Sequence, residues 1–203
     1  MNGSSRNTNG NDQGQSGAPD SGDGAQPLSR THIVCIVDRS GSMQPIAGDA
    51  IGGYNSFLES QRKLPGAAVV TLVLFDHEYE RLCTALPIAQ APRLDHRSYV
   101  PRGTTALLDA IGRTIEDVQK EMTRKEAVDE KVIVAILTDG MENASTDYTF
   151  ERIAERIAEM QQEHGWEFVY LGANQDAISV ASKMSIPAAS SASFDATGSG
   201  VRH

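Results

Sequence analysis

The sequence is short of cysteine and has no long hydrophobic run, and each shortage excludes a class of protein. Its 203 residues include only two cysteines, Cys35 and Cys83, which form no Cys-x-x-Cys pair. Both lie in apolar runs, so we expect buried, reduced thiols in a cytoplasmic protein rather than a disulfide framework. No apolar run approaches the roughly 20 residues that a membrane-spanning helix needs. The first residues lack the basic and apolar regions of a secretory signal.

Basic residues are also scarce. The chain holds 18 Lys and Arg against 27 Asp and Glu, which gives a formal net charge of −9. Proteins that bind nucleic acid normally carry a basic stripe, and proteins that cling to anionic lipid carry a basic patch. We therefore expect neither nucleic acid nor a membrane as a partner, and we interpret the acidity as a means of keeping the surface soluble.

Large apolar side chains are nearly missing from residues 1–30. After Met1, Leu28 is the only large aliphatic residue there, and Gly, Ser, Asn, Asp and Gln predominate. Such a segment cannot bury enough apolar surface to offset the entropy of ordering. We predict a disordered tail over 1–30 and one folded domain over 31–203, since a domain typically has about 100–200 residues.

From Thr31 onward, apolar runs alternate with helical periods. Strands are predicted at 32–38, 68–76, 78–86, 131–139, 166–172 and 191–196, and helices at 45–63, 105–122, 149–165 and 174–184. The segment 78–86 alternates and is predicted as a short antiparallel edge strand, while Gly52 and Gly53 weaken the first helix. Strands that are apolar on both faces and alternate with helices are typical of a parallel sheet covered on both sides. The sequence therefore predicts an α/β, doubly wound, mostly parallel and Rossmann-like sheet.

Oxygen-bearing side chains follow the predicted strands at the edge where such folds bind ligands. An Asp-x-Ser-x-Ser string follows the first strand, Asp139-Gly140 follows the strand that begins at 131, and a Thr-rich helix start lies between them. Hard oxygen ligands select Mg²⁺, or Mn²⁺ or Ca²⁺, over zinc and copper. The alternative is that Asp38 and the two serines form a helix cap before Pro45.

These motifs resemble the metal-ion-dependent adhesion site of von Willebrand factor type A (vWA) domains. Matched residue by residue, the resemblance implies that the metal ligands are Asp38, Ser40, Ser42, Thr105 and Asp139. Thr105 fits better than Thr104, because the small and apolar pair that follows at a fixed distance in the family is Ala110-Ile111 here. The likeness runs from about Thr31 to Phe194. Strings such as VDRSGSM and ILTDGMENAS look closest to stand-alone intracellular bacterial members.

The resemblance implies a metal-dependent protein-interaction module rather than an enzyme. In such a module an acidic side chain of a partner protein enters the open coordination position of the ion. Family members usually close the sheet with a final helix, and the residues after Phe194 are too few for one. We therefore expect the domain to lack that helix.

A Mg²⁺-dependent hydrolase or phosphoryl-transfer enzyme is the rival hypothesis. An aspartyl-phosphate mechanism needs Asp-x-Asp after the first strand, where this chain has Asp38-Arg39-Ser40. The sequence also has no Gly-x-x-x-x-Gly-Lys-Ser/Thr loop, no Gly-x-Ser-x-Gly elbow and no His-x-x-His-type pair.

Several neighbouring polar residues have an open role. Met43, Glu142, Asn143 and Ser145 are predicted either to rim the site or to be ordinary loop residues. Asp76 and Asp176 are predicted as cap or turn residues, and Asp109 as a charge that serves the N-terminus of its own helix.

Overall fold

The computed structural model describes residues 30–124, 130–139, 141–172 and 177–193. The predicted tail lies outside this range except for Arg30. Asn174, where the last predicted helix begins, Asp176 and the segment after 193, on which the prediction about a final helix depends, also lie outside it. Within the described residues, none of the helices is both long enough and apolar enough to cross a membrane.

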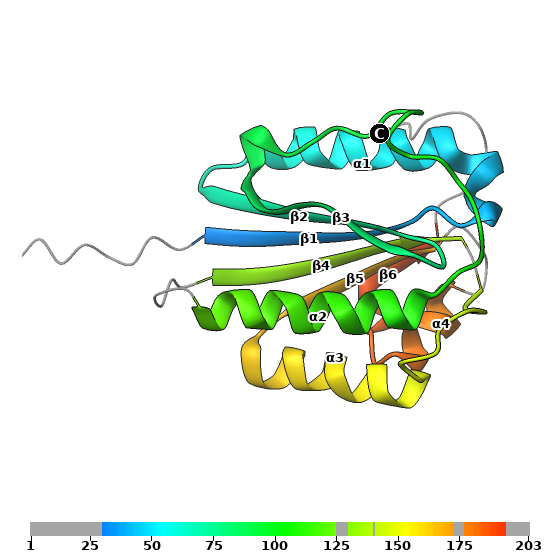
Figure 1. The fold of residues 1–203 in the computed structure, drawn as a ribbon. Helices are drawn as coiled ribbons and strands as arrows, with labels where there is room; N and C mark the ends of the chain where they lie inside the picture. Colours follow the sequence, from blue (N-terminus) through cyan, green and yellow to red (C-terminus); the bar gives the residue numbers. More distant parts are fainter. Residues whose placement is uncertain (1–29, 125–129, 140, 173–176, 194–203) are drawn as a thin grey trace, which may run out of the picture.

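The described residues form one six-stranded sheet with the order β3-β2-β1-β4-β5-β6 (Figure 1). The strands are β1 (Arg30–Asp38), β2 (Ala67–Phe75), β3 (Tyr79–Pro87), β4 (Glu130–Thr138), β5 (Glu167–Gly172) and β6 (Ser191–Ser193). All neighbours are parallel except β3, which is antiparallel to β2 at the edge. The predicted doubly wound sheet with one antiparallel edge strand is therefore confirmed.

Helices cover both faces of the sheet, with α1 on one face and α2 and α3 on the other (Figure 1). Their bounds are α1 (Ala47–Arg62), α2 (Leu107–Arg124), α3 (Phe150–His164) and α4 (Ala177–Lys183). The first helix starts later than predicted, because Pro45 belongs to a 3-10 helix over Gly41–Ile46. Gly52 and Gly53 do not interrupt α1, since both are exposed and the helix is held by buried side chains such as Tyr54 and Leu58.

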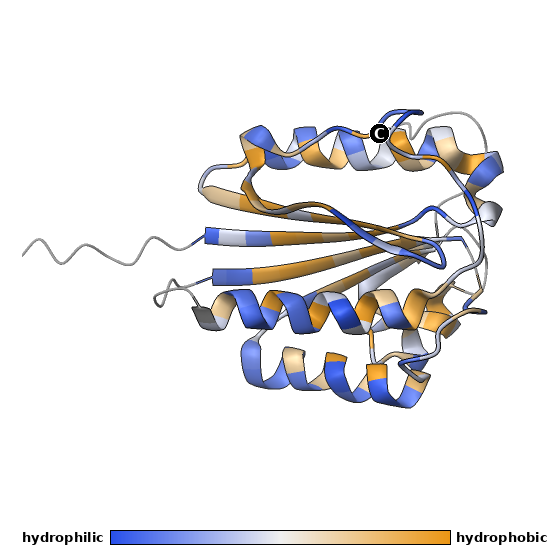
Figure 2. Ribbon diagram, in the orientation of Figure 1, coloured by the Kyte–Doolittle hydropathy of each residue, from blue (hydrophilic) through white to orange (hydrophobic). Residues whose placement is uncertain are grey.

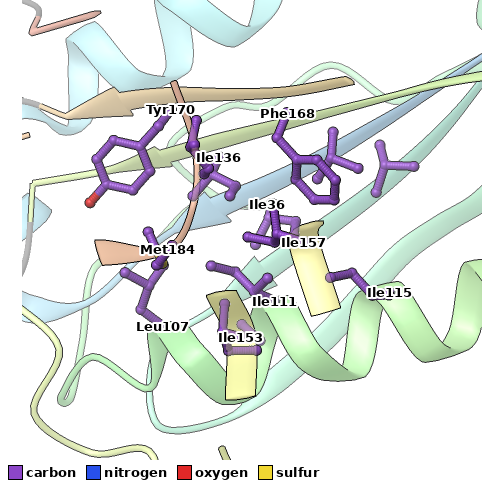
Figure 3. Packing of buried hydrophobic residues seen from close by; sticks show 14 of the residues in the cluster. Ile36, Leu107, Ile111, Ile115, Ile136, Ile153, Ile157, Phe168, Tyr170 and Met184 are labelled. Atoms are coloured by element: carbon purple, nitrogen blue, oxygen red, sulfur yellow. The ribbon is translucent and has the colours of Figure 1, made fainter. Parts of the chain in front are cut away.

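Each face of the sheet has its own hydrophobic core. Alternate residues of β1 divide between the two: Val34 and Ile36 pack toward α2 and α3, while Ile33, Cys35 and Val37 pack toward α1. Figure 2 shows the hydrophobic strands between the amphipathic helices. In Figure 3, Ile36 and Ile136 of the sheet lie beside residues of α2 and α3. Both faces of β1 are buried, whereas β4 is buried on one face and partly buried on the other. The ends of these strands are therefore the places where their polar residues can meet.

The two cysteines are free and buried, as expected. Burial, together with the nearby Cys83, raises the pKa of the Cys35 thiol to about 12. This thiol is therefore protonated and unreactive at neutral pH.

Candidate metal centre

The carboxyl ends of β1 and β4 bring the two predicted acids to one edge of the sheet. Asp38 is the last residue of β1, and Asp139 directly follows Thr138, the last residue of β4. The two strands are parallel neighbours in register, with Val37 opposite Leu137. Asp38 is fully buried and Asp139 is partly buried. The strand pairing itself therefore sets the two carboxylates side by side.

A chain of hydrogen bonds joins the serines to both acids. The Ser40 amide donates to Asp38 Oδ1 at 2.6 Å, and the Ser40 and Ser42 hydroxyl oxygens lie 3.0 Å apart. The Ser42 hydroxyl donates to Asp139 Oδ1 at 2.8 Å. Four of the five predicted site residues, from two segments about a hundred positions apart in the chain, therefore meet in one network.

The helix-cap alternative does not fit these bonds. Ser40 does occupy the N-cap position of the 3-10 helix over Gly41–Ile46, but its side chain makes no capping hydrogen bond. The two serine hydroxyls instead contact each other and Asp139. The Asp-x-Ser-x-Ser string thus directs its oxygens across the sheet edge rather than along its own helix.

Two residues that hold Asp38 were not predicted from the sequence. The Thr138 hydroxyl donates to Asp38 Oδ2 at 2.5 Å, and the Tyr99 hydroxyl donates to the Asp38 carbonyl oxygen at 2.5 Å. Thr138 lies in a strand that reads as purely apolar, and Tyr99 lies in a loop without periodicity. No local signal in either segment points to Asp38.

The electrostatics of the site favour a cation. Burial raises the pKa of Asp38, and the charge of Asp139 adds to the effect, while hydrogen bonds from Thr138 and Ser40 offset part of it. Burial also raises the pKa of Asp139, against the hydrogen bond from Ser42. The Thr138 hydroxyl and the Ser40 amide donate to Asp38, and neither group carries a positive charge. A group of oxygen donors with partly uncompensated negative charge fits a divalent ion.

Backbone contacts set the position of Thr105. Its side chain is buried, whereas Thr104 is exposed. Its carbonyl oxygen accepts from the amides of Asn143 and Ala144, and its own amide donates to Asn143 Oδ1 at 2.9 Å. Two residues earlier, the carbonyl of Gly103 accepts from the amide of Gly41 at 3.1 Å. The segment 103–105 therefore lies between the loops that follow β1 and β4.

Of the four residues considered for the rim, Asn143 is exposed and accepts a hydrogen bond from the Thr105 amide, whereas the other three make contacts within the loop, the start of α2 or the core. Glu142 accepts hydrogen bonds from the Leu108 amide at the start of α2, and Ser145 accepts from the amide of Asp109. Both thereby satisfy amides that the first turn of a helix leaves without partners. Met43 is fully buried, so it is no rim residue either.

Asp109 is an acidic residue in the first turn of α2, as the prediction of a charge at that N-terminus requires. Its carboxylate also accepts hydrogen bonds from the backbone amides of Thr146, Asp147 and Tyr148, and so it holds the loop as well. The loop and the first turn of α2 therefore bind each other reciprocally. The carboxylate of Glu142 in the loop accepts from a helix amide, and the carboxylate of Asp109 in the helix accepts from a loop amide.

Asp76 is a turn residue, as predicted, but it is also the buried centre of an ion-pair cluster. It is fully buried directly after β2, and its Oδ1 accepts from the Glu78 amide at 2.7 Å. Its Oδ2 accepts from Arg39 Nε and from Arg102 Nε, each at 2.9 Å. Burial raises the pKa of Asp76, but these hydrogen bonds outweigh it and hold the pKa below its usual value.

Comparison with known proteins shows the fold. A scan against protein-family models gives no match, and a search of curated proteins gives none either. Solved structures do match, among them the pilus adhesin SpaC of Lactobacillus rhamnosus GG, with a TM-score of 0.59 and 16% identity over 84% of this chain and 28% of that one.

Two further structures align with similar quality. A von Willebrand factor type A protein from Catenulispora acidiphila gives a TM-score of 0.53 with 18% identity, over 77% of this chain and 36% of that chain. Manganese-loaded TRAP of Plasmodium vivax gives 0.52 with 18% identity, over 72% and 58%. The chain thus spans less than two thirds of each of these proteins. Together with the sheet order, these likenesses show the fold of a vWA domain.

Proposed function

We propose that this chain is a metal-dependent protein-interaction module. In this proposal a Mg²⁺ ion, or Mn²⁺ or Ca²⁺, is held by Asp38, Ser40, Ser42, Thr105 and Asp139, as in a metal-ion-dependent adhesion site. The observation that carries the proposal is the pair of carboxylates at neighbouring strand ends, joined through serine hydroxyls, with only neutral groups donating to Asp38 in the bonds described above.

The hydrogen bonds leave oxygen lone pairs for such an ion. A carboxylate offers about four lone-pair sites, and the Ser40 amide and the Thr138 hydroxyl use one on each oxygen of Asp38. A serine hydroxyl has two lone pairs and one proton, so Ser42 can donate to Asp139 and still face an ion. When bound, the ion would supply an electrophilic position that an acidic side chain of a partner completes.

The comparisons support this proposal at a coarse level. SpaC is a pilus adhesin, and the TRAP structure is loaded with manganese. The first likeness is consistent with a protein partner, and the second is consistent with a divalent ion. The acidic character of the partner residue, a cytoplasmic location and a likeness to stand-alone bacterial members belong to the proposal and derive from the sequence.

We also propose that the module is not an enzyme. Ser40 stands where an aspartyl-phosphate mechanism would need its second carboxylate, and its hydroxyl lies beside that of Ser42. The imidazole of His77 contacts Asp76, at 3.1 Å, rather than either acid of the site. Turnover of generic phosphoesters with Mg²⁺ by the wild type, lost in Asp38→Ala, would contradict this part of the proposal.

Metal titration tests the main proposal. The dissociation constant for Mn²⁺ is measured for the wild type, for Asp38→Ala and Asp139→Ala, and for Asp49→Ala, a control aspartate in the first turn of α1. We expect the two site variants to lose binding and the control to retain it. Equal binding by all four proteins would contradict the proposed site. Capture of partner proteins should likewise fail in chelator and with Asp38→Ala.

A further inference from the structure

A second group of charged residues lies beside the proposed metal site without belonging to it. This group, called the Asp76 cluster below, consists of Arg39, Asp76 and Arg102. The Asp76 side chain contacts both arginines and is shielded from solvent, with 0% of its surface accessible. The accessible fraction is 7% for the side chain of Arg39 and 49% for that of Arg102. Each arginine also pairs with a glutamate, Arg39 with Glu80 at 2.5 Å and Arg102 with Glu78.

The members of the Asp76 cluster come from three different segments. Arg39 stands between two proposed ligands, Asp38 and Ser40, in the loop after β1. Asp76 begins the turn after β2, and Arg102 lies in the segment that leads to Thr105. One carboxylate therefore joins both segments that carry the proposed hydroxyl ligands.

Backbone hydrogen bonds run along the same connection. The Arg39 amide donates to the carbonyl of Phe75 at 2.7 Å, and the Arg102 amide donates to the carbonyl of Arg39 at 2.8 Å. The Ala106 amide, next to Thr105, donates to the Asp76 carbonyl at 2.9 Å. The turn after β2 thus serves as the base on which the loop after β1 and the segment 102–106 are both fixed.

The cluster also determines where the positive charge of Arg39 points. The guanidinium of Arg39 is buried and forms ion pairs with Asp76, directly after β2, and with Glu80 in β3. Its positive charge is therefore balanced by these two carboxylates. Without Asp76, a buried arginine next to two proposed ligands would lose its buried partner and keep only the half-exposed Glu80 among the ion pairs described. A buried ion that loses its partner is strongly unfavourable, so the loop would have to shift.

We infer that Asp76, acting through Arg39 and Arg102, positions the loop after β1 and the Thr105 segment against each other and so sets the metal affinity of the site. Asp76 is a positioning residue, because it contacts none of the five proposed ligands in the bonds described. This inference rests on the proposed metal-binding function and adds a requirement that the ligand motif does not contain.

Mn²⁺ affinity of the full chain tests the inference. Asp76→Asn and Arg102→Gln are compared with two matched controls, each measured at a temperature where circular dichroism shows the variant to be folded. Glu130→Gln breaks a buried ion pair with Arg30 at the opposite end of β1, and Arg93→Gln removes an exposed arginine that pairs with Glu59.

We expect Asp76→Asn to weaken Mn²⁺ binding by about tenfold or more, the effect typical of residues that orient metal ligands. Arg102→Gln should weaken it less, since Arg39 still holds Asp76. The electron paramagnetic resonance spectrum of bound Mn²⁺ should change in both variants, and the controls should match the wild type in affinity and spectrum.

Wild-type affinity in folded Asp76→Asn and Arg102→Gln would overturn the inference and leave the proposed function standing. Equal weakening in Glu130→Gln would also overturn it, because the effect would then be one of general stability. If Asp76→Asn does not fold, Arg102→Gln decides by the same criterion. Failure of the wild type to bind Mn²⁺ would overturn the inference and the proposed function together.

Discussion

The ends of β1 and β2 carry the same kind of residue in opposite electrostatic settings. Asp38 and Asp76 are both fully buried aspartates at the carboxyl ends of neighbouring parallel strands. Burial raises the pKa of Asp38, which accepts hydrogen bonds from neutral groups of Thr138 and Ser40. Hydrogen bonds from two arginines and from the Glu78 amide instead hold the pKa of Asp76 below its usual value. A buried carboxylate whose charge is balanced by arginines stabilises the fold. A buried carboxylate that accepts only from neutral groups is suited to bind a cation.

The strongest way to break this comparison is to remove the compensated carboxylate. Asp76→Asn should lower the free energy of unfolding by about 3 kcal/mol, because it removes the buried charge that pairs with Arg39 and leaves this arginine with the half-exposed Glu80. Urea unfolding in chelator measures the change. A variant as stable as the wild type would show that Asp76 contributes no more than a surface charge.

The pH dependence of the same variant makes this prediction sharper. A carboxyl group whose pKa is lowered in the folded protein contributes stability above its unfolded value of about 3.9, and loses it as the pH falls through the folded value. The stability difference between wild type and Asp76→Asn should therefore shrink in acid, below about pH 4. A difference that does not depend on pH would indicate that packing, not charge, is responsible.

At Asp38, whose carboxylate has no positively charged partner in the bonds described, we expect the stability of the protein to depend on bound metal instead. At a Mn²⁺ concentration of 100 times the dissociation constant, the wild type should gain about 2.7 kcal/mol of unfolding free energy over its value in chelator. Asp38→Asn should lose this gain while remaining at least as stable as the wild type in chelator, since it removes a buried charge. A variant that keeps the full gain would contradict the proposed role of Asp38.

The neutral donor to Asp38 gives a smaller effect. Thr138→Val keeps the shape of the side chain but removes the hydrogen bond to Asp38 Oδ2, which should cost about 1.5 kcal/mol. In the Asp38→Asn background the same substitution should cost less, because the bond no longer involves a charge. A double-mutant cycle of urea unfolding measures this coupling, and its absence would contradict it.

We expect the smallest change in unfolding free energy for exposed charged residues far from both aspartates. Lys131 pairs with Glu167 at 2.8 Å, and both side chains are about half exposed. Lys131→Gln should change the free energy of unfolding by about 0.5 kcal/mol or less, because exposed ion pairs are screened by water. A larger loss in urea unfolding would mean that surface charge matters more in this protein than the comparison assumes.

The sheet could be predicted from the sequence because most of its strands are continuous apolar runs, and the antiparallel edge strand because the residue pattern over 78–86 alternates. The start of α1 could not, since Pro45 fits the 3-10 helix that precedes it. The exposed Gly52 and Gly53 weakened the prediction of a helix that packing against the sheet nevertheless stabilises.

The candidate site could be predicted only where its residues lie within a short string or at the end of a strand. Asp38, Ser40, Ser42 and Asp139 are such residues, and the structure brings them together. Thr138 was missed because its partner lies 100 positions away and is reached only through the pairing of β1 with β4.

The orientation of single loop residues was likewise beyond prediction. Glu142 and Ser145 turn toward the helix, and Met43 turns into the core beneath α1. A sequence pattern without periodicity does not specify which way such a side chain points.

The reciprocal carboxylate–amide hydrogen bonds between α2 and the loop after β4 have a consequence for the hydrogen exchange of backbone amides. The amides of Thr146, Asp147 and Tyr148 lie in an irregular segment, yet each donates to the carboxylate of Asp109, which is buried in the first turn of the helix. Such amides exchange only when the loop and the helix end separate. In deuterated water, these three positions should therefore exchange with the slow kinetics of a helix, although the chain there has the irregular path of a loop.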